Sequence, residues 1–458
     1  MEVEAWLSRA ARTRPQHTAL RTPRGDWSYA RLHDAARYGA GRLAARGAGP
    51  GSRVAIALPA GPDFAQALHA CLLLGAVAVP VDLRLAPAER AHIADGAAVA
   101  LEEPLGEGAA PAGVPVSSRH ELDATAVVIH TSGTTSSPRP VELTYGNLLW
   151  SALGSSVALG LDPRERWLCA LPLSHVGGLS ILLRSAIYAT TAVVHERFET
   201  DRVLHALSAQ EVTLVSLVAT TLARLLDAGL ARPPALRCAL TGGGPVPAAL
   251  LERARAAGVP VSLTYGLTES CSQATTTPVA AIQREPGREP ASAGPPLFCT
   301  RLRIDGGARG GGDAEAADGE ILVRGPTVAP ASLASDGWLH TGDIGRLDEH
   351  GGLLVTGRRA DTIVSGGENV APAEVEAVLE AHPLVLEAAV LGRPDPRWGE
   401  AVTAIVVARP DAAVGVEELR EHCARALAPY KVPKRFALAA GPLPRTRSGK
   451  LLRRELTL

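Results

Sequence analysis

Short apolar runs alternate with longer helical patterns in the first part of the chain. The runs at 54–58 and 77–81 have the length and β-branched content of buried strands, and the segment 64–74 between them is typical of a helix. The run at 124–129 is a further strand, and it leads into a loop rich in Thr, Ser and Gly. Because strands alternate with helices, the pattern predicts βαβ units and a largely parallel sheet.

The same alternation continues to about residue 300 and then changes. The elements that it predicts are strands at 211–218 and 260–265 and helices at 201–208 and 248–257. From 301 to 356 the pattern becomes short strands with glycine-rich turns, which is typical of an antiparallel barrel or meander. A distinct α+β pattern occupies the remainder of the chain.

The length of the chain predicts more than one domain, because 458 residues exceed what one hydrophobic core usually holds. We predict an α/β fold with a large N-terminal domain of βα sheets and a small barrel-like part at 1–357. A hinge at 358–361 then leads to a smaller α+β C-terminal domain at 362–458. The segment 94–118 is rich in Ala, Gly, Glu and Pro and is interpreted as a surface connection.

Composition excludes several classes of partner. The chain is 46% hydrophobic and 20% charged, with a formal net charge of −1 and no basic run, so it has no electrostatic footprint for nucleic acid or for an anionic membrane. The most apolar stretch, 67–81, is too short to span a bilayer. The first residues predict an amphipathic helix and not a signal peptide. Six cysteines without metal-type spacing favour a reduced, cytoplasmic enzyme.

Six short motifs carry the candidate chemistry. They are, in chain order, HTSGTTSSPRP (130–140), LPLSHVGGLS (171–180), TGGGP (241–245), TYGLTES (264–270), GWLHTGDIG (337–345) and RTRSGK (445–450). The first motif either gathers N–H groups and hydroxyls around phosphate oxygens or is an ordinary Ser/Thr turn. TYGLTES either includes a hard oxygen ligand for Mg²⁺ or is a strand-end turn, and Asp343 alone would more often be a turn residue.

The use of lysine singles out the last motif. Of the 46 Lys and Arg residues, only Lys431, Lys434 and Lys450 are Lys. Lys offers a compact ammonium on a flexible stem, whereas Arg offers a planar fork, so a chain that uses Arg almost everywhere has kept Lys450 for chemistry. The alternative is that Lys450 belongs to a basic, solvated tail. The scarcity of Lys in the chain argues against this alternative.

In order and spacing, the six motifs resemble those of the adenylate-forming superfamily of acyl-CoA synthetases, luciferases and peptide-synthetase adenylation domains, over residues 10–458. The resemblance implies that a carboxylate attacks the α-phosphate of MgATP and that CoA then displaces AMP from the acyl-adenylate. It also implies that Tyr265 stacks on adenine, Thr268 contacts the α-phosphate and Glu269 holds Mg²⁺. Lys450 is then the adenylation lysine, which stabilises the transition state as a point charge.

The resemblance assigns further binding residues. Asp343 and Arg358 contact the ribose. The residues of the phosphate loop are Thr131, Ser132, Gly133, Thr134, Thr135 and Arg139. Those of the adenine wall are Gly242, Gly243, Gly244, Pro245 and Gly266. The wall of the pantetheine tunnel consists of Ser365, Gly366 and Gly367. Glycine suits both walls, because it lets a flat base or a thiol arm approach the backbone.

Four residues depart from the family pattern. Ser136 and Pro140 stand where Gly is usual and restrict the backbone, while Arg139 replaces a Lys and keeps its charge. Ala360 stands at the hinge where Asp or Lys is usual, which removes a side-chain contact but does not prevent rotation. Because the loop is altered, a function of another class also remains open, in which the protein binds an adenylate without catalysis.

Two segments indicate the acid. LPLSHVGGLSILLRSAIY (171–188) and TAVVHERF (191–198) resemble o-succinylbenzoate–CoA ligases of menaquinone biosynthesis. His175 either gates the carboxylate or packs as a core histidine. Ser180 and Arg184 share a helix face, and Arg184 either pairs with the free carboxylate of the acid or is solvated. Aryl-, fatty- and dicarboxylic-acid CoA ligases remain alternatives.

We therefore expect an AMP-forming acid–CoA ligase that uses ATP, Mg²⁺ and coenzyme A. Its partners are then a small carboxylic acid, ATP and CoA, with no nucleic acid and no membrane span. The sequence leaves a monomer and a homodimer both open.

Overall fold

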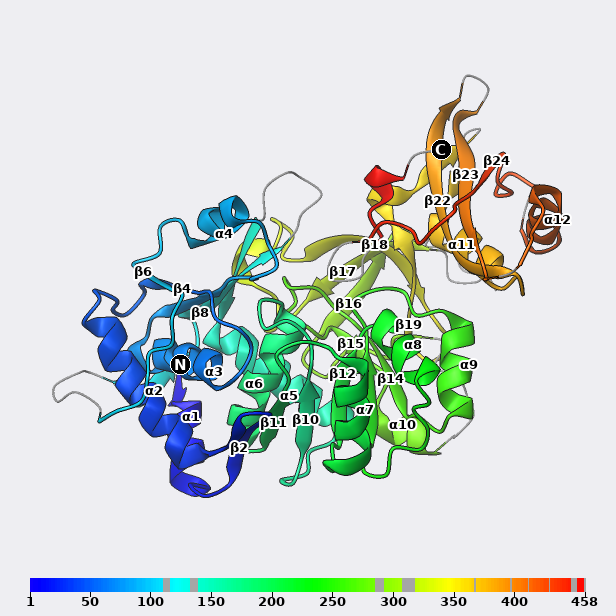
Figure 1. Cartoon of the computed structure of the whole chain (residues 1–458). Coiled ribbons are helices and arrows are strands. Elements are labelled where there is room, and N and C mark those ends of the chain that lie inside the picture. Colours follow the sequence, from blue (N-terminus) through cyan, green and yellow to red (C-terminus); the bar gives the residue numbers. More distant parts are fainter. Residues whose placement is uncertain are drawn as a thin grey trace. The chain divides into compact units, whose positions relative to one another are not determined.

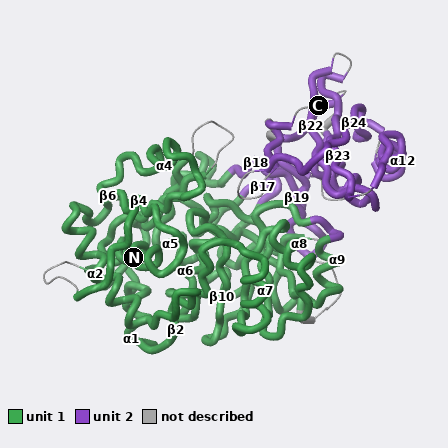
Figure 2. Tube along the Cα trace, viewed as in Figure 1, with its two compact units in different colours: residues 1–246, 250–302, 323–339 green, residues 247–249, 303–322, 340–458 purple. Residues whose placement is uncertain are grey.

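The computed structural model describes residues 1–109, 116–131, 139–284, 292–306, 318–365, 368–395, 398–410, 412–427, 429–445 and 451–456 (Figure 1). The chain divides into two compact units (Figure 2). Unit 1 comprises residues 1–246, 250–302 and 323–339, and unit 2 comprises 247–249, 303–322 and 340–458. In the described part of the chain, no helix combines the length and the apolar character that crossing a bilayer requires.

An eight-stranded sheet forms one half of unit 1. Its strands, in spatial order, are β15 (Thr275–Thr276), β14 (Val261–Tyr265), β13 (Cys238–Thr241), β12 (Leu214–Leu217), β10 (Arg166–Cys169), β11 (Thr191–Val194), β2 (Thr18–Thr22) and β3 (Gly25–Ser28). The strands from β14 to β2 are parallel to their neighbours, and β15 and β3 add antiparallel edges. The predicted parallel arrangement of strands is confirmed here.

Helices cover both faces of this sheet, because successive residues of each strand point to opposite sides. On β10, Trp167 and Cys169 belong to one apolar core and Leu168 belongs to another. The second core packs residues of the strands against α7 (Thr200–Ala209), α8 (Ala219–Asp227) and α9 (Ala248–Ala256). These helices and strands include the four elements predicted between 201 and 265.

A five-stranded sheet forms the other half of unit 1. Its order is β6 (Val99–Leu101), β4 (Arg53–Ile56), β5 (Val77–Pro80), β8 (Thr125–Thr131) and β9 (Arg139–Thr144). The first four strands are parallel, and β9 returns antiparallel to β8. The interpretation of 94–118 as a plain surface connection is wrong for Val99–Leu101, because this short run pairs with β4 and buries Leu101 completely.

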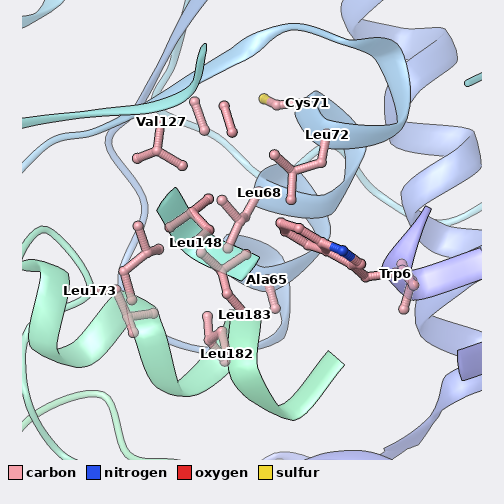
Figure 3. Packing of buried hydrophobic residues seen from close by; sticks show 14 of the residues in the cluster. Trp6, Ala65, Leu68, Cys71, Leu72, Val127, Leu148, Leu173, Leu182 and Leu183 are labelled. Atoms are coloured by element: carbon pink, nitrogen blue, oxygen red, sulfur yellow. The ribbon is translucent and has the colours of Figure 1, made fainter. Parts of the chain in front are cut away.

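The main core lies between the two sheets and is filled by helices. Figure 3 shows Leu68 and Leu72 of α3 (Pro62–Leu74) together with Leu148 of α5 (Tyr145–Leu159) and Leu182 of α6 (Val176–Tyr188). Helix α3 begins with a proline, whose missing N–H costs nothing there, and it ends at Gly75 with a φ of 73°, a backbone conformation that glycine adopts most easily. This core therefore fixes the two sheets of unit 1 to each other.

The remaining elements of unit 1 lie outside its two main sheets. They are β1 (Glu2–Glu4) paired with β7 (Arg119–Glu121), α1 (Trp6–Thr13), α2 (Tyr29–Ala44), α4 (Pro87–Ala94), α10 (Val279–Arg284) and the 3-10 turn η1 (Pro330–Ser332). The predicted N-terminal amphipathic helix is α1, which buries Trp6 and Leu7.

Unit 2 holds most of a four-stranded sheet and an α+β part. The four-stranded sheet has the order β16 (Arg301–Asp305), β17 (Gly319–Arg324), β18 (Leu339–Leu347) and β19 (Leu353–Arg358). The α+β part consists of β21 (Glu368–Val370), β20 (Ile363–Ser365), β23 (Gly399–Ala408), β22 (Val385–Asp395) and β24 (Arg435–Leu438), with α11 (Pro372–Glu380), α12 (Val416–Ala426), η2 (Arg359–Asp361) and η3 (Arg453–Glu455). Residues 340–357 thus cluster with the C-terminal part, whereas the hinge at 358–361 stays a prediction.

Candidate active site

The glycines assigned to the adenine wall lie where two adjacent parallel strands of unit 1 end. Thr241, the last residue of β13, pairs with Leu263 of β14, and the glycine motif follows at once. A Cβ atom on Gly242 would lie 2.6 Å from the carbonyl oxygen of Thr264, and Gly243 has a φ of 79°. Both positions therefore require glycine, for space and for conformation respectively. Carboxyl ends of parallel strands are the usual place for ligands in α/β sheets.

A tight turn carries Tyr265, Thr268 and Glu269. Tyr265 ends β14, and its carbonyl accepts the N–H of Ala274 at 2.8 Å, which closes the turn. A Cβ atom on Gly266 would lie 1.7 Å from the carbonyl oxygen of Ser272, so only glycine fits. Thr268 and Glu269 are partly exposed at the tip of this turn. The geometry leaves their side chains accessible to a ligand.

The phosphate loop is described only at its two ends. Thr131 ends β8 and Arg139 begins β9, and these residues face each other in the antiparallel ladder. The Thr131 hydroxyl donates to the carbonyl of Arg139 at 3.3 Å, and the Arg139 side chain is exposed. Ser132, Gly133, Thr134 and Thr135 lie outside the described residues, as does Ser136. Their assignment to ATP phosphates stays a prediction.

Within unit 2, the two residues assigned to the ribose are brought together. Asp343 of β18 and Arg358 of β19 are partners in the strand register, and the Arg358 Nε atom lies 3.1 Å from Asp343 Oδ1. The Asp343 backbone N–H donates to the hydroxyl of Thr341 at 3.0 Å. The Asp343 side chain is 15% exposed, so one face of the carboxylate still meets solvent. This arrangement suits a carboxylate that accepts hydroxyl groups beside a fixed cation.

The residues assigned to CoA and to adenylation are described only in part. Ser365 ends β20 and is buried, and its hydroxyl has no hydrogen-bond partner among the described residues. Gly366, Gly367 and Lys450 lie outside the described residues. Their roles stay predictions.

His175 contacts two residues that the motifs do not include. It is the N-cap residue of α6, and its Nε2 atom lies 3.2 Å from Arg84 Nη2 and 3.7 Å from Asp82 Oδ2. Its side chain is 43% exposed, which argues against the alternative of a core histidine. Burial alone would raise the pKa of Asp82, but hydrogen bonds from the Arg84 side chain and backbone lower it to about 2. Asp82 is therefore a carboxylate that holds Arg84 against His175.

Arg184 is buried, so the alternative of a solvated Arg184 is wrong. Its residue exposure is 2%, and burial lowers the pKa of its guanidinium from the ordinary value. Nη2 donates to Ser151 Oγ at 3.0 Å, the guanidinium lies 5.5 Å from the centre of the Trp167 ring, and Nε has no partner in the described part of the chain. Among the described residues, no acidic side chain pairs with Arg184. Ser180 is also buried, and its hydroxyl donates within α6 to the carbonyl of Val176.

Arg184 lies close to the TYGLTES turn through one shared neighbour. The Ser151 hydroxyl, which accepts from Arg184, donates to the carbonyl of Cys271 at 2.6 Å. Cys271 follows Glu269 by two positions in the same turn. The buried guanidinium is therefore linked through Ser151 to the turn that carries Glu269.

Comparison with known families identifies the chain. Residues 7–101 and 95–332 match the family described as AMP-binding enzyme, and residues 374–450 match the family described as AMP-binding enzyme C-terminal domain. The chain belongs to the AMP-binding enzyme family. The predicted resemblance to adenylate-forming enzymes is confirmed.

Similar proteins span the whole chain. A 2-succinylbenzoate–CoA ligase of Bacillus subtilis (strain 168) is 39% identical over 484 residues, which cover 98% of this chain and 97% of that protein. The solved B. subtilis o-succinylbenzoate CoA synthetase in complex with the acyl-adenylate OSB-AMP is 38% identical with a TM-score of 0.89, over 99% of this chain and 98% of that one. The same protein in complex with ATP and magnesium ion has a TM-score of 0.89 at 38% identity over 100% of both chains. The predicted fold class, a large α/β N-terminal domain with a smaller C-terminal one, is confirmed.

Proposed function

We propose that this AMP-binding enzyme is a 2-succinylbenzoate–CoA ligase of menaquinone biosynthesis. In the first step, a carboxylate oxygen of the acid forms a bond to the α-phosphorus of ATP, and the bond from that phosphorus to the β,γ-phosphates breaks, so pyrophosphate leaves. In the second step, the CoA sulfur bonds to the acyl carbon, the thiol proton is released and AMP departs. Relatives that carry this name over almost the full length of the chain support the proposal.

Residues of unit 1 bind MgATP in the first step. Tyr265 stacks on adenine beside Gly242, Thr268 holds the α-phosphate and Arg139 reaches the outer phosphates. Glu269 holds Mg²⁺, which neutralises charge on the leaving pyrophosphate when bound. The described residues contain no group of three His, Cys, Asp or Glu side chains that could hold a metal ion. Mg²⁺ does not require such a group of side chains, because it commonly binds through one or two carboxylates and the phosphates of the substrate.

Residues of the C-terminal part act in alternation. Lys450 stabilises the charge of the adenylation transition state, and Asp343 and Arg358 hold the ribose. Rotation at 358–361 then withdraws Lys450 and presents Ser365, Gly366 and Gly367 to the pantetheine arm. One site thereby performs two reactions in sequence.

The single observation that carries the choice of acid is the burial of Arg184 without an acidic partner among the described residues. A buried cation is costly unless it is paired, so a ligand carboxylate is the natural partner. o-Succinylbenzoate has two carboxylates, one of which stays free while the other is adenylated. Arg184 binds the free one, and His175, held by Asp82 and Arg84, gates the other.

The substrates also suggest a place in the cell. ATP and CoA are both supplied in the cytoplasm, and all six cysteines are free thiols, so we place the enzyme there. Its oligomeric state, monomer or homodimer, is open to measurement by light scattering.

Pyrophosphate exchange into ATP tests the proposal. A panel of o-succinylbenzoate, benzoate, a dicarboxylic acid and a medium-chain fatty acid is compared by kcat/KM, with thioester formation measured in parallel. The proposal expects the highest value for o-succinylbenzoate. Preference for another acid would replace the substrate, and absence of exchange with every acid would favour an adenylate-binding protein without catalysis.

A further inference from the structure

Asn147 lies between two nucleotide-binding segments of unit 1, although no motif includes it. It is the third residue of α5, which begins directly after β9, and it is 4% exposed. Its Oδ1 atom accepts the backbone N–H of Thr144 at 2.9 Å, and its own backbone N–H donates to Thr144 Oγ1 at 3.0 Å. This reciprocal capping fixes the junction between β9 and α5.

The amide group of Asn147 also reaches a segment that touches Glu269. Nδ2 donates to the carbonyl oxygens of Pro326 at 2.8 Å and of Val328 at 3.0 Å. The next residue, Ala329, donates its backbone N–H to the carbonyl of Glu269 at 2.8 Å. Both N–H groups of the amide and its oxygen are thus used, and the segment 326–329 connects Asn147 to the TYGLTES turn.

The other side of the connection is the phosphate loop. The loop leaves β8 after Thr131 and enters β9 at Arg139, and these two residues pair in the ladder. Strand β9 runs from there to Thr144, the residue that Asn147 caps. A path of hydrogen bonds and short stretches of backbone therefore joins Thr131 and Arg139 to the backbone of Glu269.

We propose that Asn147 is a positioning residue that fixes the backbone of Glu269 relative to the paired strand ends at Thr131 and Arg139, and so sets the affinity of the enzyme for Mg²⁺ in the ATP complex. The inference rests on the proposed function, in which Glu269 holds the cation. Mg²⁺ demands near-ideal octahedral geometry, so a carboxylate and phosphates that share it must keep a fixed separation. A misplacement of about 1 Å can cost about 10²-fold in rate.

Asn147→Asp separates this role from helix capping. Asp keeps an oxygen that accepts the Thr144 N–H, and a negative charge suits the N-terminus of a helix. Its other oxygen offers no N–H to Pro326 and Val328. Thr144→Ala is the matched control, because it removes the capping hydroxyl and leaves the two amide bonds. Asn147→Ala, which places no oxygen near those carbonyls, replaces Asn147→Asp if the latter does not fold.

The measurement is a Mg²⁺ titration of ATP–pyrophosphate exchange, with the melting temperature recorded for each variant. We expect Asn147→Asp to raise the half-saturating Mg²⁺ concentration by about tenfold or more at unchanged KM for the acid. Thr144→Ala should keep the parent value even if its melting temperature falls further. Equal Mg²⁺ dependence in parent and Asn147→Asp overturns the proposal.

A parent protein without exchange activity contradicts the proposed function and not this inference. The same variants are then compared by calorimetric binding of Mg²⁺ with ATP. Weaker binding in Asn147→Asp alone supports the positioning role, and equal binding in all three proteins overturns it.

Discussion

At the scale of single residues, the candidate site depends on side chains that lie outside its motifs. Arg184 is fixed by Ser151, 33 positions away, and His175 contacts Arg84, 91 positions away. The sequence predicted His175 and Arg184 as candidates but not these partners, because the contacts join elements that no local pattern relates. It also left the burial of Arg184 open, since an Arg on an amphipathic helix can face either way.

Arg184→Ala tests the assignment of the acid. Removing one partner of a buried charge pair typically costs about 2–5 kcal/mol, so kcat/KM for o-succinylbenzoate should fall by at least about tenfold. The value for benzoate, which has no second carboxylate, should change far less. Arg184→Lys retains a positive charge without the planar fork of Arg, so its kcat/KM for o-succinylbenzoate should lie between the values of the parent and of Arg184→Ala. A selectivity ratio equal to that of the parent would show that Arg184 is structural.

Asp82→Asn tests whether Asp82 and Arg84 hold His175. The variant removes the charge that fixes Arg84, so we expect KM for the acid to rise about fivefold, which corresponds to a loss of about 1 kcal/mol of binding free energy. KM for ATP should change little. The lowered pKa of Asp82, about 2, means that its contribution is present above the ordinary value of 3.8 and is lost as pH falls through 2. Asp82 therefore stays a carboxylate between about pH 6 and pH 9, and its own titration should not change the effect of the substitution over that range.

Asp162→Asn is the matched control for that variant. Asp162 accepts the same three hydrogen bonds from Arg164, two residues later, and these bonds also lower its pKa to about 2. It lies before β10, at the end of the sheet opposite to the strand ends that carry the site. A similar rise in KM in both variants would mean that the effect does not act through His175.

At the scale of elements, strand ends and turns position the chemistry. The helices and strands that the sequence named between 54 and 81 and between 201 and 265 lie within a few residues of those in the structure, because their apolar runs have the right length and period. The short strand Val99–Leu101 was missed, since three residues within an Ala- and Gly-rich segment show no period. At Gly242 and Gly266 the structure gives a steric reason for glycine, whereas the binding roles assigned to these and the other site residues stay predictions.

Gly266→Ala tests the turn that carries Thr268 and Glu269. The new Cβ would lie 1.7 Å from the Ser272 carbonyl oxygen, so the turn must open. Overpacking of this kind costs about 1–3 kcal/mol of stability, and displacement of Glu269 should lower the adenylation rate by about tenfold or more. Gly49→Ala, where a Cβ meets nothing within 4 Å, is the control for denaturant unfolding and for pyrophosphate exchange. Normal adenylation by Gly266→Ala would place the working carboxylate elsewhere.

At the scale of the whole molecule, the residues assigned to one reaction are divided between two compact units. Unit 1 carries the glycines assigned to the adenine wall and the buried Arg184, whereas unit 2 carries Asp343, Arg358 and Ser365. The sequence predicted a boundary at 357 from the change of pattern, but it could not tell that residues 340–357 cluster with the C-terminal part. Clustering of that kind depends on pairing between segments that are separated in the sequence, such as that of β20 with β23.

The central claim is that one site performs adenylation and thioester formation in turn, with Lys450 acting only in the first. Single-turnover kinetics of Lys450→Ala on each half-reaction test it most directly. We predict that formation of the acyl-adenylate falls by two to three decades, the loss of about 3–4 kcal/mol expected for one transition-state contact, while CoA transfer from supplied acyl-adenylate stays near the parent rate. An equal loss in both half-reactions would contradict the account.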